Sequence, residues 1–278
     1  MKTAVMTGAT GFLGGALLRE LIAEDWFVYA LCRRDSRRRH RLEGLDRIEI
    51  IETDLSSATV DTRITGCDAF FHLAWEGGRN SFDEQFENVG ITLNCLRLAE
   101  KLGAKTFLCT GSQAEYGETR EMITEETAVN PCTSYGAAKA AAYFLARDYA
   151  KQTNVSLLWT RVFSVYGEHD NPNSLIPCLC KSLRKTGSAQ LTTDGTQMWN
   201  YLHETDAARA LRLLVESGVE GVFNVASMES RPLREYVGMI SDRISFGTEK
   251  SDVNLNVSVD KLHAVIGEWE KRQFEIAI

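Results

Sequence analysis

Tyr135 and Lys139 are the two residues whose types and spacing point most directly to chemistry. They stand four positions apart at the start of an Ala-rich segment, so a helix there would place both on one face, about one turn apart. A lysine ammonium beside a phenol favours the phenolate and lowers the tyrosine pKa toward working pH. The spacing is also common by chance on helices, with a half-exposed tyrosine and a solvated lysine, so the pair needs support from elsewhere in the chain.

A glycine-rich turn near the start of the sequence gives that support. Gly8, Gly11 and Gly14 follow a β-type run at 3–7 and open a helical pattern. In a strand–turn–helix unit the first glycine permits the tight turn, the second lets the backbone approach a pyrophosphate, and the third lets the helix pack on the strand. Free N–H groups at the helix N-terminus then face the phosphates. We therefore predict a dinucleotide site here rather than an ordinary strand–helix turn.

A serine adds a third candidate group. Ser112 follows a predicted strand at 105–109, which places it at the carboxyl edge of a parallel sheet, where ligands bind in such folds. Its hydroxyl can hydrogen-bond a substrate carbonyl or hydroxyl. The conjunction of Ser112, Tyr135 and Lys139 with the glycine turn is much more specific than any one of these signals.

The end of the second predicted strand indicates which nicotinamide cofactor binds. NAD sites usually carry an acidic residue there for the ribose hydroxyls, whereas this chain has Cys32-Arg33-Arg34, with Asp35 beyond them. Because Arg33 can pair with a 2′-phosphate, we favour NADP(H) over NAD(H). The alternative is that the six arginines among residues 33–41 form a solvated face. We assign to the surface Arg37, Arg38, Arg39 and Arg41.

Alternating strands and helices must position these groups. Strands are predicted at 3–7, 27–32, 47–52, 68–73, 105–109, 155–161 and 222–225, helices at 17–26, 83–102, 134–151, 174–186 and 206–216, a shorter helix or turn within 55–66, and one or two helices after 233. This order predicts an α/β fold with a doubly wound, parallel Rossmann sheet and a small mixed α/β substrate-binding region on its C-terminal side. The expected division is a dinucleotide-binding domain at 1–165 with a return segment at about 203–226, and a substrate-binding region at 166–202 and 227–278.

Together these motifs resemble those of the extended short-chain dehydrogenase/reductase family, the NAD(P)-dependent nucleotide-sugar epimerases, dehydratases and reductases. The matching segments run through nearly the whole chain: Thr-Gly-Ala-Thr-Gly-Phe-Leu-Gly at 7–14, Asp54-Leu55, His72-Leu73-Ala74, Asn88, Ser112 within Gly-Ser-Gln-Ala-Glu-Tyr-Gly, Tyr-Gly-Ala-Ala-Lys at 135–139, Arg-Val-Phe-Ser-Val-Tyr-Gly at 161–167, and the stretch 195–206.

The resemblance implies a role for each catalytic candidate. Tyr135 would exchange a proton with a sugar oxygen, Ser112 would orient that oxygen, and Lys139 would bind the nicotinamide ribose and tune Tyr135. The cofactor-binding candidates are Gly8, Thr10, Gly11, Phe12, Leu13, Gly14, Arg33, Asp54, Leu55, Leu73, Ala74, Tyr135, Lys139 and Phe163, and the substrate-binding candidates are Gln113, Ser164 and Trp199. No pair of histidines has metal-ligand spacing, so no metal is expected.

The loop after Ser112 separates the branches of that family. Dehydratases carry an Asp-Glu pair directly after the Ser or Thr, but this chain has Gln113 and Ala114, which cannot transfer a proton. Glu115 would either be displaced from that role or, as we favour, make a local hydrogen bond. Because Arg33 suggests NADPH, we favour reduction of a 4-keto-6-deoxy sugar nucleotide. The alternative is a nucleotide-sugar 4-epimerase, and a non-catalytic cofactor-binding protein is less favoured because the catalytic candidates are all present.

Two departures from the family pattern concern the substrate. Ser164 stands where an Asn usually contacts the nucleotide sugar, and Trp199 stands where an Arg usually grips a phosphate. Trp199 would either stack on a base or sugar or serve as a core or lid aromatic. His72, His169 and His203 are interpreted as structural residues.

Composition bounds the remaining classes. The chain has 278 residues and 31 Lys and Arg against 38 Asp and Glu, a net charge of −7, which argues against nucleic-acid binding. No apolar run approaches the ~20 residues of a membrane span, no signal-peptide core is present, and the seven Cys form no Cys-x-x-Cys, so a cytoplasmic protein is expected. The helix at 83–102 has two apolar stripes, which with 134–151 predicts a homodimer through a four-helix interface, unless the second stripe packs inside the monomer.

Overall fold

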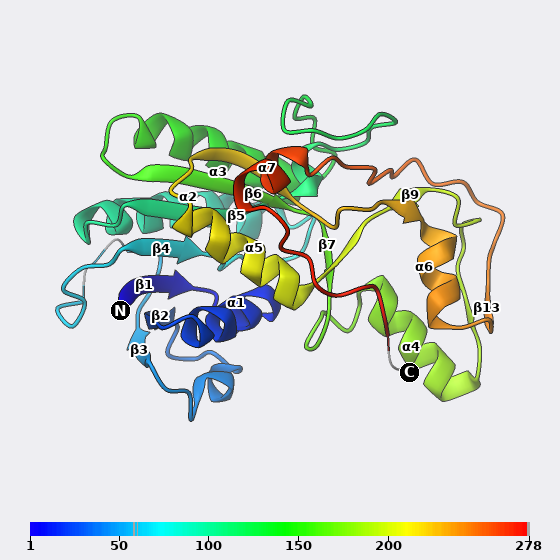
Figure 1. The fold of residues 1–278 in the computed structure, drawn as a ribbon, viewed down its shortest axis with the longest axis horizontal. Helices are drawn as coiled ribbons and strands as arrows, with labels where there is room; N and C mark the ends of the chain where they lie inside the picture. Colours follow the sequence, from blue (N-terminus) through cyan, green and yellow to red (C-terminus); the bar gives the residue numbers. More distant parts are fainter. Residues whose placement is uncertain (58, 60, 277–278) are drawn as a thin grey trace.

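The computed structural model describes residues 1–57, 59 and 61–276. Its centre is a parallel seven-stranded sheet in the order β3-β2-β1-β4-β5-β6-β11 (Figure 1). The strands are β1 (Lys2–Thr7), β2 (Trp26–Cys32), β3 (Ile48–Glu52), β4 (Ala69–His72), β5 (Thr106–Ser112), β6 (Ser156–Val162) and β11 (Gly221–Val225). The strand order reverses between β1 and β4, as in a doubly wound fold, so the predicted α/β Rossmann sheet is confirmed.

Helices cover both faces of this sheet, which is why its strands are apolar on both sides. On one face α1 (Phe12–Ala23) packs against α5 (Glu204–Glu216), and on the other α2 (Phe82–Lys101) packs against α3 (Ser134–Ala150). Each pair closes a separate hydrophobic core on the sheet. Representative buried residues are Leu17, Leu21, Leu211 and Leu214 in the first core and Phe70, Leu96, Phe107 and Ala142 in the second.

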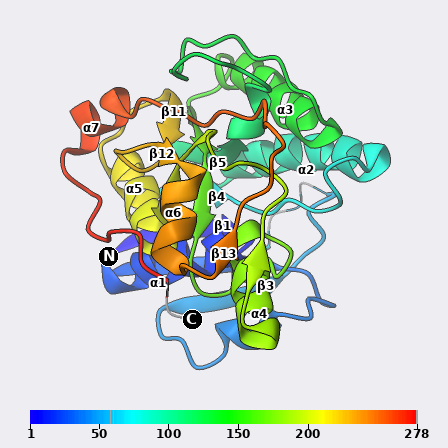
Figure 2. The same ribbon diagram turned by 90° about the vertical axis from the view of Figure 1, so that its right-hand side faces the viewer.

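A smaller region lies at one end of the molecule, away from the N-terminus, where Figures 1 and 2 show α4 and α6. Three short strand pairs, β7–β10, β9–β12 and β8–β13, link it together. Its elements are β7 (Ser164–Tyr166), α4 (Leu175–Thr186), β8 (Ala189–Gln190), β9 (Met198–Trp199), β10 (Tyr201–His203), β12 (Arg231–Pro232), α6 (Leu233–Ile240) and β13 (Ile244–Ser245). Helix α7 (Asp260–Ile266) lies apart from this region and packs against α5 and β11. A third apolar cluster, which includes Tyr166, Leu179, Tyr201 and Tyr236, fills it.

The chain returns to the main sheet through α5 and β11, which pairs with β6. The segment after α7 then crosses α5, where the backbone N–H groups of Lys271 and Arg272 donate to the buried Asp206 carboxylate at 3.1 and 3.0 Å. The domain division predicted from the sequence stays a prediction.

Two predicted segments are made more exact by the structure. The segment 55–66, predicted as a shorter helix or a turn, contains turns and no helix among its described residues, and residues 58 and 60 lie outside them. Strand β5 continues three residues beyond the predicted Cys109, because Thr110, Gly111 and Ser112 keep pairing with β6. Ser112 is therefore the last residue of a central strand rather than a loop residue. No helix in the described part of the chain is long and apolar enough to cross a membrane.

Candidate active site

Two positions around the turn between β1 and α1, Gly8 and Gly14, have room only for glycine. A Cβ on Gly8, whose φ is +78°, would lie 2.7 Å from the backbone of Leu73 and Ala74, and one on Gly14 would lie 2.0 Å from the Gly8 carbonyl oxygen. Gly11 is the N-cap of α1 and provides no side-chain cap, and the first turn carries no acidic residue. The first N–H groups of α1 therefore face outward uncapped, as a pyrophosphate site requires. These residues fit a bound dinucleotide.

The other cofactor candidates near the glycine turn differ in their burial and in which of their atoms a cofactor could contact. Leu73 and Ala74 continue β4 beside the turn, where the Ala74 N–H donates to the Thr7 hydroxyl at 3.2 Å. Thr10, Phe12 and Leu13 are half-buried around the turn. Phe163 is buried in the core with its ring centroid 6.4 Å from that of Tyr116, so its backbone rather than its ring is what it can offer a cofactor.

The end of β2 carries the arginine predicted to meet a 2′-phosphate. Arg33 is exposed and forms an ion pair with Glu76 at 2.5 Å. The assignment of Arg41 to the surface is wrong. Arg41 is half-buried, and its guanidinium donates to the Thr10 carbonyl oxygen at 3.2 Å, beside the glycine turn. The short 3₁₀ helix Arg39–Leu42 brings Arg41 to this position. No local sequence pattern predicted this contact.

Asp54 and Leu55, expected near the adenine, follow β3. The exposed Asp54 carboxylate accepts hydrogen bonds from the N–H and hydroxyl of Ser56 at 2.9 and 2.7 Å. These bonds hold the pKa of Asp54 below its ordinary value. Leu55 is half-buried against the core of the second face. The carboxylate thus shapes the turn that carries Leu55.

The three catalytic candidates are brought together at the carboxyl end of β5. Ser112 ends that strand, Tyr135 lies in the first turn of α3, and Lys139 follows one turn later on the same face. The Ser112 side chain is close enough to Tyr135 to act on the pKa of the phenol. Helix α3 starts here because the Thr133 hydroxyl accepts the Gly136 N–H at 3.1 Å, a side-chain N-cap.

Burial dominates the electrostatics of this group. Lys139 is 2% exposed, and desolvation lowers its pKa to about 8. Desolvation also raises the pKa of Tyr135, against the opposing effects of the Ser112 hydrogen bond and the Arg79 charge. The net direction is opposite to the lowering expected from Lys139. Tyr135 is therefore in its proton-bearing form near neutral pH.

Lys139 has two close partners. Its ammonium donates to the Thr110 carbonyl oxygen at 2.5 Å and lies 3.6 Å from the centroid of the Trp75 ring. The centroid of the Tyr135 ring is farther, at 5.9 Å. Trp75 was not singled out from the sequence, because a tryptophan after His-Leu-Ala has no spacing signal that connects it with a residue 64 positions later.

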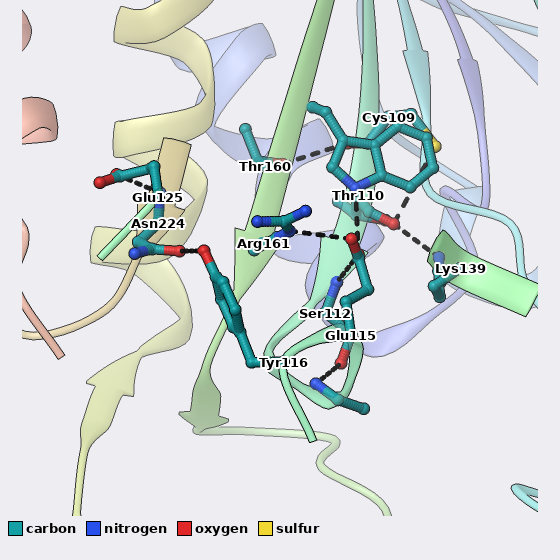
Figure 3. A network of polar contacts seen from close by, with 12 residues as sticks. Cys109, Thr110, Ser112, Glu115, Tyr116, Glu125, Lys139, Thr160, Arg161 and Asn224 are labelled. Atoms are coloured by element: carbon teal, nitrogen blue, oxygen red, sulfur yellow. Dashed lines mark hydrogen bonds and ion pairs between the residues drawn. The ribbon is translucent and has the colours of Figure 1, made fainter. Parts of the chain in front are cut away.

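Glu115 is fully buried, and Figure 3 shows its contacts with Ser112 and its other partners. One of its oxygens accepts from the Ser112 N–H at 2.8 Å and the Trp159 indole N–H at 3.0 Å, and the other accepts from Arg161 Nε at 2.8 Å. The favoured interpretation of Glu115 as a local hydrogen-bonding carboxylate is confirmed. The network continues from Arg161, whose guanidinium lies 4.5 Å from the centroid of the Tyr116 ring.

The loop between β4 and α2 is fastened by buried amides. Asn88 donates to the Glu76 carbonyl oxygen at 2.9 Å and accepts its N–H at 3.1 Å. Gln85 donates to the same carbonyl at 3.1 Å. The Arg79 carbonyl oxygen of this loop accepts the Tyr135 N–H at 2.9 Å. Of these residues only Asn88 had a sequence signal, through the family resemblance.

The predicted substrate residues lie around the same edge. Gln113 is half-buried in the 3₁₀ helix Gln113–Glu115, and Ser164 begins β7, paired with Tyr201. Trp199 is half-buried, packs against two of the apolar clusters and lies 6.2 Å from Tyr201 between ring centroids. It thus has the position of a core aromatic of the smaller region.

Two of the three histidines interpreted as structural, His203 and His72, have structural partners. His203 accepts the Thr205 N–H at 3.2 Å and so caps α5, and His72 is buried between the hydroxyls of Thr7 and Thr92. Burial lowers the pKa of His72 to about 3. The described residues contain no group of three or more His, Cys, Asp or Glu placed to hold a metal.

The fold and these sites agree with comparisons to known proteins. The family model described as "NAD dependent epimerase/dehydratase family" matches residues 4–226. The chain therefore belongs to the NAD-dependent epimerase/dehydratase family, as the motifs led us to expect, and it is an enzyme.

Its relatives in that family differ in reaction. A Bacillus subtilis (strain 168) protein named as an uncharacterized UDP-glucose epimerase is 22% identical and covers 86% of this chain and 81% of its own. A dTDP-6-deoxy-L-talose 4-dehydrogenase (NAD(+)) of Aggregatibacter actinomycetemcomitans is 24% identical over 84% and 87%. The structure of a UDP-N-acetylglucosamine 4-epimerase from Methanobrevibacter ruminantium M1 superimposes with a TM-score of 0.85, 24% identity, and coverage of 97% and 93%.

The buried ion pair beneath Ser112 gives a testable stability difference. Arg161→Leu leaves the Glu115 carboxylate buried without its cation, so we expect the free energy of unfolding to fall by about 3–5 kcal/mol. Adding Glu115→Gln should recover part of this loss, because the uncompensated charge is removed. Urea unfolding of both variants measures the difference. Equal losses in the single and the double variant would contradict this account.

Proposed function

We propose that this enzyme reduces the 4-keto group of a 4-keto-6-deoxy sugar nucleotide, with Tyr135 as the proton donor. The observation that carries the proposal is the set of proton-transfer groups at the end of β5. Tyr135 is kept protonated by burial, Gln113 and Ala114 cannot transfer a proton, and Glu115 is committed to Arg161. Ketone reduction needs one proton at one oxygen, whereas dehydration needs a further acid and base.

Each residue then has one task. The hydroxyls of Ser112 and Tyr135 bind the keto oxygen together, and Tyr135 releases its proton to that oxygen as negative charge develops. The Lys139 ammonium favours the phenolate that remains and binds the nicotinamide ribose. The glycine turn, with Thr10, Phe12, Leu13, Leu73 and Ala74 around it, holds the cofactor, which supplies the hydride when bound. Gln113 and Ser164 are proposed to contact the nucleotide sugar, whereas Trp199 packs in the smaller region as a core aromatic.

The 4-epimerase alternative uses the same residues. It is favoured by the names of the Bacillus and Methanobrevibacter relatives, whereas the name of the Aggregatibacter relative is that of a 4-dehydrogenase. An epimerase oxidises and then reduces one carbon, so it needs no added cofactor. A reductase consumes NADPH in proportion to product.

The reaction can be tested directly. We expect the purified protein to consume NADPH when mixed with a dTDP- or GDP-4-keto-6-deoxy sugar, and Tyr135→Phe to slow this by ~10²–10⁴-fold because the proton donor is lost. The control is Tyr149→Phe, which removes a hydroxyl of α3 that bonds Glu100 and should keep wild-type activity. Interconversion of 4-epimers without added cofactor, and no NADPH consumption with any 4-keto sugar, would establish the alternative.

We further propose that the cofactor is NADP(H). The support is a pair of guanidinium groups at the proposed adenosine end. Arg33 directly follows β2, where NAD sites carry an acid, and Arg41 lies against Thr10. Two arginines can bind a 2′-phosphate through charge-assisted hydrogen bonds.

Substitution of these arginines tests the cofactor proposal. Arg33→Ala and Arg41→Ala should each weaken NADPH binding by ~10–100-fold, since a hydrogen bond to a charged group contributes ~1.5–3 kcal/mol. NADH affinity should be unchanged. Arg37→Ala, an exposed arginine of the same segment, is the matched control. Calorimetric titration measures both cofactors, and tighter binding of NADH than NADPH by the wild type would refute the preference.

We also propose a homodimer formed through α2 and α3. Cys95, Leu98 and Leu102 of the second apolar stripe predicted for 83–102 are buried in the second hydrophobic core. That stripe therefore packs inside the monomer. The apolar surface left over lies elsewhere on the two helices: Phe82, Phe86, Phe144 and Leu145 are exposed. A second copy related by a twofold axis would cover these side chains in a four-helix interface.

Charge placed on that surface should separate the subunits. Phe86→Glu is expected to convert a dimer into a folded monomer, because a carboxylate would be buried at the interface. Met239→Glu, which alters an exposed apolar residue of α6, should leave the mass unchanged. Sedimentation equilibrium measures the masses, and a wild-type protein that is monomeric at every concentration would contradict the dimer.

A further inference from the structure

The Lys139 ammonium lies over the ring of Trp75, a contact that the proposed role of Lys139 does not require. The ammonium lies 3.6 Å from the centroid of the Trp75 ring, a close cation–π distance. No carboxylate in the described part of the chain forms an ion pair with Lys139. Glu115, a carboxylate that acts on the pKa of Lys139, is already bonded to Arg161.

We propose that Trp75 is a positioning residue that keeps the Lys139 side chain charged and fixed on the face of α3 that also carries Tyr135. This rests on the proposed function, in which that ammonium binds the nicotinamide ribose and favours the Tyr135 phenolate. The negative face of the indole takes the place of a counter-carboxylate. A carboxylate there would be a competing proton acceptor beside Tyr135, and an aromatic ring is not.

The indole is held in place for this contact. Its N–H donates to Gln85 Oε1 at 2.7 Å, and Gln85 is 1% exposed. The Gln85 amide in turn donates to the carbonyl oxygens of Glu76 and Gly78 at 3.1 and 3.0 Å. These bonds fix both the amide orientation and the plane of the ring. The same ring meets Tyr135 edge to face, with centroids 6.0 Å apart.

The sign of the effect follows from the environment of Lys139. Desolvation lowers its pKa to about 8, so a substantial fraction is neutral just above neutral pH unless a partner favours the charged form. Removal of the Trp75 ring removes such a partner, so the pKa falls further. The other titratable groups that face the ammonium are His72 on β4, Cys109 on β5, Glu115 after β5, and Tyr135 on α3.

The test measures that charge directly, on the full chain without cofactor or substrate. Protein labelled with ¹³C at the lysine ε-carbons is titrated by NMR, and the Lys139 signal is assigned by its loss in Lys139→Arg. We expect the midpoint to be lower by about one pH unit in Trp75→Leu than in the wild type. In Trp75→Phe, which keeps an aromatic face without the indole N–H, we expect most of the wild-type value. Circular dichroism confirms that each variant is folded.

A matched control removes an aromatic ring beneath a cation elsewhere. Phe246→Leu takes the ring from under Arg234, where the distance to the centroid is 5.3 Å, and should leave the Lys139 titration unchanged. The proposal is overturned when Trp75→Leu titrates like the wild type. It is also overturned when Trp75→Phe falls as far as Trp75→Leu, because the aromatic face would then not be the cause.

Enzyme activity separates this proposal from the proposed reaction. With ketone reduction as the assay, the high-pH limb of kcat/KM should move to lower pH in Trp75→Leu and stay in Trp75→Phe. When the wild type reduces no 4-keto sugar but the NMR titrations behave as expected, the reaction is wrong and the Trp75–Lys139 contact stands. When reduction occurs but the titrations do not differ, only the positioning role of Trp75 is overturned.

Discussion

The buried charge of Lys139 is the constraint on which the arrangement of the site depends. An ammonium taken out of water is costly unless it is hydrogen-bonded or paired, and Lys139 is 2% exposed. Its partners are the Thr110 carbonyl oxygen and the Trp75 ring. Both must stay in place for the charge to persist, so the end of β5 and the loop after β4 are each fastened by a separate set of buried contacts.

The end of β5 is held in place both by an ion pair and by close packing. A Cβ on Gly111 would lie 2.4 Å from the Glu115 carboxylate and 2.2 Å from the Trp159 indole nitrogen, so only glycine lets that carboxylate approach the strand. Arg161, which pairs with Gly111 in the sheet, reaches the same carboxylate from β6. The strand end that carries Ser112 is therefore set by a charge pair within the core. Such a pair contributes more to a unique geometry here than to stability, because its desolvation offsets much of its attraction.

The sequence predicted what depends on local spacing. The glycine turn, the face shared by Tyr135 and Lys139, and the strands of the main sheet follow from patterns within about 10 residues. It did not predict the contact of Arg41 with Thr10, or that of Trp75 with Lys139, because chain folding alone brings those pairs together. The predicted lowering of the Tyr135 pKa was wrong for the same reason. The spacing revealed the neighbouring cation but not the burial, which raises the pKa more than the cation lowers it.

The loop after β4 joins the two ends of the proposed cofactor site. Trp75 contacts Lys139, which we propose binds the nicotinamide ribose, and the next residue, Glu76, pairs with Arg33 directly after β2. Both partners of the Arg33–Glu76 pair are more than half exposed, so the pair contributes at most about 1 kcal/mol. An anion arriving at Arg33 can displace Glu76 at little cost, whereas Gln85 and Asn88 keep the backbone of the loop where it is. Arg33 can thus exchange partners while Trp75 and the charge of Lys139 stay in place.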